Sequence, residues 1–140
     1  MSPWETLPHP SDLRVRVRAR DRRELFEEAA RSTFALCARP IGGWPEKLET
    51  REIDARGEDE VGLLHRLLAE CLFAFESERF LARDVAVVQF SPRECRLRLR
   101  GACFAPEELE VDHVIKAVTW HGLSIIDGPE GVSAEILHDL

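Results

Sequence analysis

Two stretches of the chain repeat apolar residues every three or four positions, which is the spacing of one face of an α-helix. The first stripe runs from Leu25 to Cys37, and Asp21 with Glu24 three residues later forms a start like a capping box. The second runs from Val61 to Phe75 behind the acidic residues 58–60, whose charges suit the positive end of a helix. The pattern therefore predicts two amphipathic helices whose apolar faces belong to the core.

Most of the remaining segments alternate apolar and polar residues or are short apolar runs, as β-strands do. Turn residues separate them, among them Ser91-Pro92, Gly101 and Asp127-Gly128-Pro129. This order of elements predicts a single α+β domain over residues 1–140, with the two helices on a mixed, mainly antiparallel sheet. The expected strands cover residues 13–20, 47–55, 85–90, 94–100, 111–120, 123–126 and 132–137.

Arginines occupy every second position in two of these strands, at residues 13–20 and again at 94–100. If the two strands share a sheet face, the arginines form a compact basic patch in which directly opposed guanidinium groups repel each other. Either acidic neighbours then interleave with them, or a partner such as RNA or an acidic protein supplies the negative charge. The patch would comprise Arg14, Arg16, Arg18, Arg96 and Arg98.

The composition excludes several classes of protein. A formal charge of −7 argues against indiscriminate nucleic-acid binding, which depends on many basic residues. No apolar run approaches the roughly 20 residues of a membrane span, and the first residues lack an export signal, so we expect a cytoplasmic protein without membrane contact. The four cysteines form no CxxC pair, so we expect buried apolar cysteines and no structural zinc. Nucleotide-binding loops and hydrolase motifs are also absent.

Two aspartates near the two ends of the chain are the main candidate functional residues. Asp12 stands just ahead of the first arginine-bearing strand, and Asp139 is followed by Leu140. A hard divalent cation needs several oxygen ligands, which these carboxylates and the backbone or terminal oxygens of Leu140 can supply. For each aspartate alone, a turn or capping role is the alternative. Lys116 and His121 place a cation and an imidazole near a strand end and are the next candidates.

The order of these features resembles the archease family. The matching segments are His9-Pro10-Ser11-Asp12-Leu13 for the His-Thr-Ala-Asp-Ile motif, Gly57-Glu58-Asp59 before the second helix, Lys116 to Gly122 for Lys-Ala-Val-Thr-Tyr-His-Gly, and Asp139-Leu140. The departures from the family pattern are Trp120 for tyrosine, Pro10-Ser11 for Thr-Ala, Arg14 for glycine and His138 for an aromatic residue. These departures affect the detailed shape of the candidate cation pocket at Asp12, Asp139 and Leu140.

The resemblance implies an accessory protein without catalysis of its own, which promotes guanylylation and multiple turnover of an RtcB-type RNA ligase acting on tRNA or other RNA. It also implies a divalent-cation site at Asp12, Asp139 and Leu140, with His9 orienting Asp12. Lys116 would face a phosphate or an acidic group on the ligase, and His121 would either position the pocket or cap the strand.

Oxygen ligands favour calcium, magnesium or manganese, and an imidazole from His138 would favour manganese. Two alternatives from other functional classes stay open. One is a stand-alone metal-dependent phosphohydrolase, because a bound cation can generate a reactive hydroxide from water. The other is an RNA- or protein-binding module that uses the arginine rows.

Overall fold

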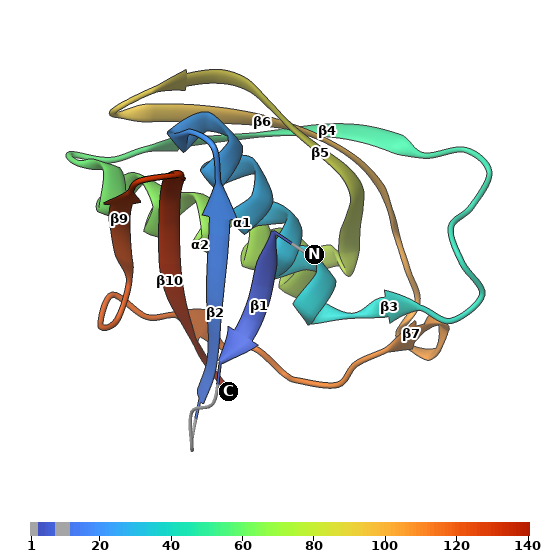
Figure 1. The fold of residues 1–140 in the computed structure, drawn as a ribbon. Coiled ribbons are helices and arrows are strands. Elements are labelled where there is room, and N and C mark those ends of the chain that lie inside the picture. The colour runs from blue at the N-terminus through green and yellow to red at the C-terminus, as the bar shows by residue number, and fades with distance from the viewer. Residues whose placement is uncertain (1–2, 8–11) are drawn as a thin grey trace.

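The computed structural model describes residues 3–7 and 12–140, and its ribbon is shown in Figure 1. The helices are α1 (Arg22–Cys37), α2 (Glu60–Glu78) and the short 3-10 helix η1 (Pro106–Glu108). The strands are β1 (Trp4–Leu7), β2 (Asp12–Ala19), β3 (Arg39–Pro40), β4 (Glu49–Arg56), β5 (Phe80–Ser91), β6 (Glu94–Cys103), β7 (Leu109–Glu110), β8 (Ala117–Val118), β9 (Ser124–Gly128) and β10 (Gly131–Asp139).

The strands form three sheets, and every pairing among the described strands is antiparallel. In the largest sheet β2 lies between β1 and β10, and the other edge of β10 pairs with β8 at one end and β9 at the other. The second sheet has the order β4-β6-β5, and β3 pairs with β7 in the third. The predicted α+β fold, with two helices against mainly antiparallel strands, is confirmed.

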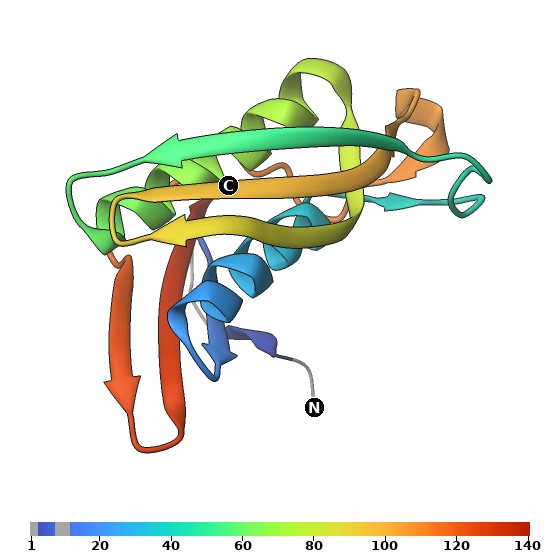
Figure 2. The ribbon, with the colours of Figure 1, turned by 90° about the horizontal axis from the view of Figure 1, so that it is seen from above.

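The first helix begins at the predicted cap, the second begins among the predicted acidic residues, and both bury the predicted stripes. The side chain of Asp21 accepts a hydrogen bond from the amide of Glu24 at 2.9 Å, and the Glu24 carboxylate reaches back to the amide of Arg20 at 3.0 Å. Asp59 accepts in the same way from the amide of Gly62 at 2.7 Å. In Figure 2 the β4-β6-β5 sheet lies over the two helices, which separate it from the β2-β10 sheet. The apolar core fills the space between these layers.

Side chains of α1 close the outer edge of the β4-β6-β5 sheet. β5 is an edge strand of this sheet, and backbone groups in its middle have partners on α1. Arg23 and Arg31 donate to the carbonyls of Val87 and Val85 at 2.7 and 2.8 Å, and the Val87 amide donates to Glu27 at 3.0 Å. At Val85 and Val87 the edge is therefore covered against pairing with a strand of another chain.

The structure differs from the predicted elements in one long segment. Residues 111–120 were expected to form a strand, but only Ala117–Val118 does so. The reason is that β9 already pairs with β10 over Gly131–Glu135, which leaves only the last residues of that edge for β8. β1, β3 and β7 were not predicted.

Three of the four cysteines are buried as expected, whereas Cys103 is exposed. The prediction fails there because Cys103 is the last residue of β6, where its thiol lies within 3.2 Å of the Arg51 guanidinium instead of in the core. None of the helices in the described part of the chain has the length and apolar character needed to cross a membrane.

Candidate functional site

The two candidate aspartates come together at one end of the largest sheet. β2 and β10 run antiparallel, and the last pair of their register is Asp12 opposite Asp139. Figure 1 shows the start of β2, in blue, beside the end of β10, in red. On the other side of β10, Ala117 pairs with Asp139, and the Lys116 amide donates to the Asp139 carbonyl at 2.7 Å. Three segments that are distant in sequence therefore meet at Asp139.

Both carboxylates lie on the outer face of this sheet. Directly opposed residues of an antiparallel pair point to the same face, and neighbours along a strand alternate. Asp12 and Asp139 consequently share one face, and the next pair, Leu13 and His138, shares the other. The burial agrees, since Asp139 is exposed and Asp12 half-buried, whereas Leu13 and His138 belong to the buried interior. Side chains in such pairs begin about 5 Å apart, which allows two carboxylates to hold one ion.

The donor atoms at this end fit a hard cation. Within residues 3–7 and 12–140, no three His, Cys, Asp or Glu side chains gather so as to hold a metal by themselves. A cation here would need further oxygens, and Leu140, which follows Asp139 directly and is 37% exposed, is placed to offer them. Two opposed carboxylates also repel each other, and a cation between them removes that cost. Asp12, Asp139 and Leu140 thus suit calcium, magnesium or manganese.

Lys116 and His121 occupy different surroundings. Lys116 is exposed, and it lines a hollow of about 430 Å³ together with Phe75, Arg79 and Val114. His121 lies in the turn after β8, where its carbonyl accepts a hydrogen bond from the Thr119 hydroxyl at 2.6 Å and its ring is exposed. The structure therefore brings the backbone of Lys116 to Asp139 and places His121 farther along the chain, beyond β8.

His138 faces away from the two carboxylates. Its ring is fully buried on the inner face, with Nδ1 3.3 Å from the Leu13 carbonyl. A carbonyl only accepts, so Nδ1 carries the hydrogen, and Nε2 has no partner among the described residues. Burial lowers the pKa of His138 to about 4. The interpretation in which His138 favours manganese is therefore wrong. His9 lies outside the described residues.

The two arginine rows do not form one patch, because β2 and β6 belong to different sheets. Acidic neighbours interleave with each row. The ion pairs of the β2 row are Arg14 with Glu135, Arg16 with Glu135 and Glu5, and Arg18 with Glu5. The ion pairs of the β6 row are Arg96 with Asp54 and Arg98 with Glu52. The structure therefore shows the alternative in which acidic residues lie among the arginines. It excludes a single basic patch made of both rows.

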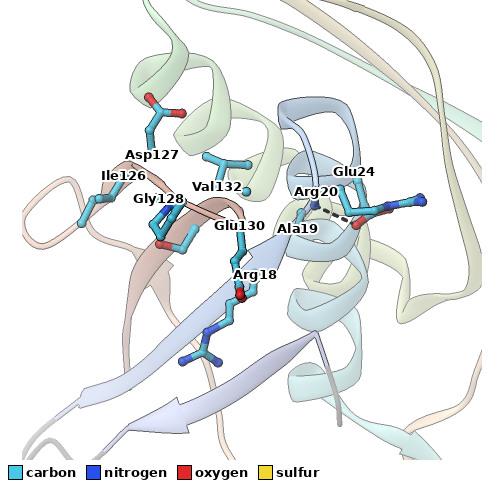
Figure 3. A pocket seen from close by; sticks show the side chains of 12 residues that line it. Arg18, Ala19, Arg20, Glu24, Ile126, Asp127, Gly128, Glu130 and Val132 are labelled. Atoms are coloured by element: carbon cyan, nitrogen blue, oxygen red, sulfur yellow. Dashed lines mark hydrogen bonds and ion pairs between the residues drawn. The ribbon is translucent and has the colours of Figure 1, made fainter.

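A hollow of about 470 Å³ lies at the opposite end of β10, between the β9–β10 hairpin and the start of α1. Figure 3 shows Ile126 and Asp127 of the hairpin pointing in opposite directions. Asp127 pairs with Arg22 at 2.8 Å, which lowers the pKa of Asp127 below its usual value. Arg22 also pairs with Glu60 of α2, so these charges tie the hairpin to both helices. Their role is structural.

Sequence reasoning missed an exposed aromatic pair. Trp120, in the turn after β8, stacks on His65 of α2 with ring centroids 4.1 Å apart. His65 falls within the predicted second helix, but the helical pattern says nothing about its partner. An unburied tryptophan in a turn was the available signal, and its partner is 55 positions away in the sequence.

Comparison with known proteins identifies the family. Residues 4–140 match the Archease protein family (MTH1598/TM1083). The archease of Methanopyrus kandleri is 34% identical over 126 residues, which cover 88% of this chain and 89% of the relative. The archease of Pyrococcus abyssi is 30% identical over 134 residues, covering 94% and 93%.

Two solved structures share the fold. Protein 1598 of Methanobacterium thermoautotrophicum has a TM-score of 0.77 at 24% identity and full coverage of both chains. A Thermotoga maritima protein, named an archease and possible chaperone, has a TM-score of 0.68 at 14% identity, covering 97% of this chain and 96% of its own. The match over residues 4–140 and the relatives at 30% identity or more show that this chain belongs to the archease family.

Proposed function

We propose that this protein is a cytoplasmic accessory factor that activates an RtcB-type RNA ligase through a divalent-cation site at Asp12, Asp139 and Leu140. Its activity would be to promote guanylylation and multiple turnover of the ligase during tRNA splicing or RNA repair, and it would not join RNA itself. The observation that carries the proposal is the register that sets Asp12 opposite Asp139, with Lys116 bonded to Asp139.

The chain's own residues support an ion-holding role at a protein surface. Asp12 and Asp139 hold a hard cation from adjacent strands, and the rigid ladder of β2 and β10 fixes their separation before any ion arrives. The exposed position of Asp139 leaves the outer side of the pocket open to a partner. When bound, the cation supplies positive charge beside the phosphates of a nucleotide, where phosphoryl transfer requires it. The exposed Lys116, whose backbone is bonded to Asp139, would offer its charge to a phosphate or an acidic group on the ligase.

The ligase assay tests this proposal. A purified RtcB-type ligase is incubated with GTP and manganese, and the covalent guanylylated enzyme is measured with and without this protein. We expect Asp12→Ala, Asp139→Ala and Lys116→Ala each to remove most of the stimulation. Glu130→Ala is the matched control, because it deletes an exposed carboxylate in the turn before β10, at the end remote from Asp139.

Three results would contradict the proposal. The first is stimulation that survives both aspartate changes. The second is phosphate release from GTP without any ligase, which would indicate a metal-dependent phosphohydrolase. The third is loss of partner binding on charge reversal at Arg16 or Arg98 while both aspartate variants stay active, which would indicate a binding module based on the arginine rows.

A further inference from the structure

Trp120 is held as a flat, exposed aromatic surface. One face of its indole stacks on the His65 ring with centroids 4.1 Å apart and planes 19° apart. The side chain is nevertheless 60% exposed, so the opposite face is open to solvent. A tryptophan buries a large apolar area when it is covered, and leaving it open in a monomer has a cost. The arrangement offers a ligand a preformed stacking surface.

The surrounding contacts fix this surface in place. The Nε2 of His65 lies 2.8 Å from the Val118 carbonyl, which orients the imidazole beneath the indole. The Thr119 amide donates to the Leu137 carbonyl at 2.9 Å, and the Leu123 amide donates to the Trp120 carbonyl at 3.3 Å. The turn that carries Trp120 is therefore tied to α2 and β10, and little conformational entropy is lost when a ring stacks on it.

Trp120 and His65 both line a hollow of about 520 Å³ with a mixed lining. The hollow has an aromatic wall, a smooth floor of small residues and a charged rim. Its floor is Gly62 and Ala69 of α2, and a Cβ at Gly62 would come within 3.4 Å of the indole, so glycine there lets the ring lie close to the helix. The rim carries two arginines and two acids, namely Arg56, Arg66, Glu58 and Asp59.

The two arginines are available to a ligand. Arg56 is 83% exposed in its pair with Glu94, and Arg66 is 64% exposed in its pair with Glu70. Exposed ion pairs of this kind contribute at most about 1 kcal/mol, so either guanidinium can turn to a phosphate. One of the acids is already engaged, because Asp59 caps α2 through the Gly62 amide. A phosphate would therefore take the place of Glu94 at Arg56 or of Glu70 at Arg66, exchanging one exposed ion pair for another.

We propose that Trp120 and His65 form a binding site for one unpaired nucleotide, whose base stacks on the open indole face and whose phosphate meets Arg56 or Arg66. A nucleotide matches both halves of the hollow, since its base is flat and its phosphate is charged. An apolar protein side chain would leave the charged rim unmatched. The nucleotide can belong to single-stranded RNA or be free. The proposal does not depend on the ligase-activation proposal.

A binding assay with two sources of the nucleotide tests the site. A fluorescein-labelled ten-nucleotide RNA without secondary structure is titrated with the protein at about 50 mM salt, and its anisotropy is measured. Unlabelled GMP is then added as a competitor. Trp120→Ala should weaken RNA binding about 5- to 150-fold, the range for removal of one stacked base, while Trp120→Phe should retain most of it. Phe73→Ala is the matched control, because Phe73 is a 64% exposed aromatic residue of α2, the helix that carries His65, and it lies outside the hollow.

Each outcome decides the proposal. Loss of binding in Trp120→Ala and not in Phe73→Ala supports it, and displacement by GMP shows that a free nucleotide is sufficient. Equal binding by all variants overturns it, as does absence of RNA and GMP binding to the wild-type protein. If Trp120→Ala loses ligase stimulation while the wild-type protein binds neither probe, the surface contacts a protein and the nucleotide site is wrong. Failure of the aspartate variants alone would leave this result unchanged.

Discussion

Acidification should destabilise this protein through its buried histidine. The native pKa of His138 is about 4 because burial disfavours the charged ring, whereas its ordinary value is 6.5. Above pH 6.5 the ring is neutral in both folded and unfolded states, so it does not affect stability there. Between pH 6.5 and pH 4 only the unfolded chain binds the proton, so stability falls with pH. At about 1.36 kcal/mol per pKa unit, the full loss is about 3 kcal/mol, of which about 2 kcal/mol is reached by pH 5.

The test compares the pH dependence of two proteins. The free energy of unfolding is measured by urea denaturation at pH 7.5, 6 and 5 for the wild-type protein and for His138→Phe. Phenylalanine cannot be protonated, so its curve should lose this fall whatever the substitution does to stability at neutral pH. Carboxylates with lowered pKa values, such as Asp84, act mainly at more acidic pH. Equal slopes in the two proteins would refute the reasoning about His138.

Three further predictions concern the metal site and the fold. Calcium at about 100 times its dissociation constant should stabilise the wild-type protein by about 2.7 kcal/mol in denaturation curves, and Asp139→Asn should abolish this gain. An equal gain in both proteins would contradict the metal site. Gly101→Ala should destabilise by about 3 kcal/mol, because the new Cβ would lie 1.8 Å from the Leu81 carbonyl oxygen, and unchanged denaturation would show that β6 adapts freely. Asp59→Ala should cost about 1 kcal/mol by loss of the cap on α2, whereas Asp59→Asn should retain most of it.

The sequence predicted those features that depend on neighbouring residues. Both helices follow from local stripes and from local start signals, the cap at Asp21 and the acidic residues 58–60, so their positions were confirmed. The meeting of Asp12 with Asp139 is a long-range pairing, and only the oxygen-ligand argument and the family resemblance suggested it. Alternation correctly showed that β2 and β6 each have an arginine face, but it contains no information on which sheet a strand joins.

The failures have the same physical origin. The apolar residues of segment 111–120 favour a strand, yet strand formation needs a free edge, and β9 occupies most of the edge of β10. The stack of Trp120 on His65 joins a turn to a helix and leaves no periodic trace in the sequence. His138 looked like a ligand because it precedes Asp139, but alternation along β10 turns its ring to the opposite face.

The closure of β5 by α1 couples two elements that are not joined in one sheet. The Val87 amide has a glutamate of α1 as its acceptor, so that proton can exchange with deuterium only when the helix side chain withdraws. Exchange at this amide would then report how often the Glu27 side chain withdraws, and not the opening of a strand ladder. The same withdrawal would uncover this point of the strand margin, so the exchange rate would also measure how often it becomes available to a strand from another chain.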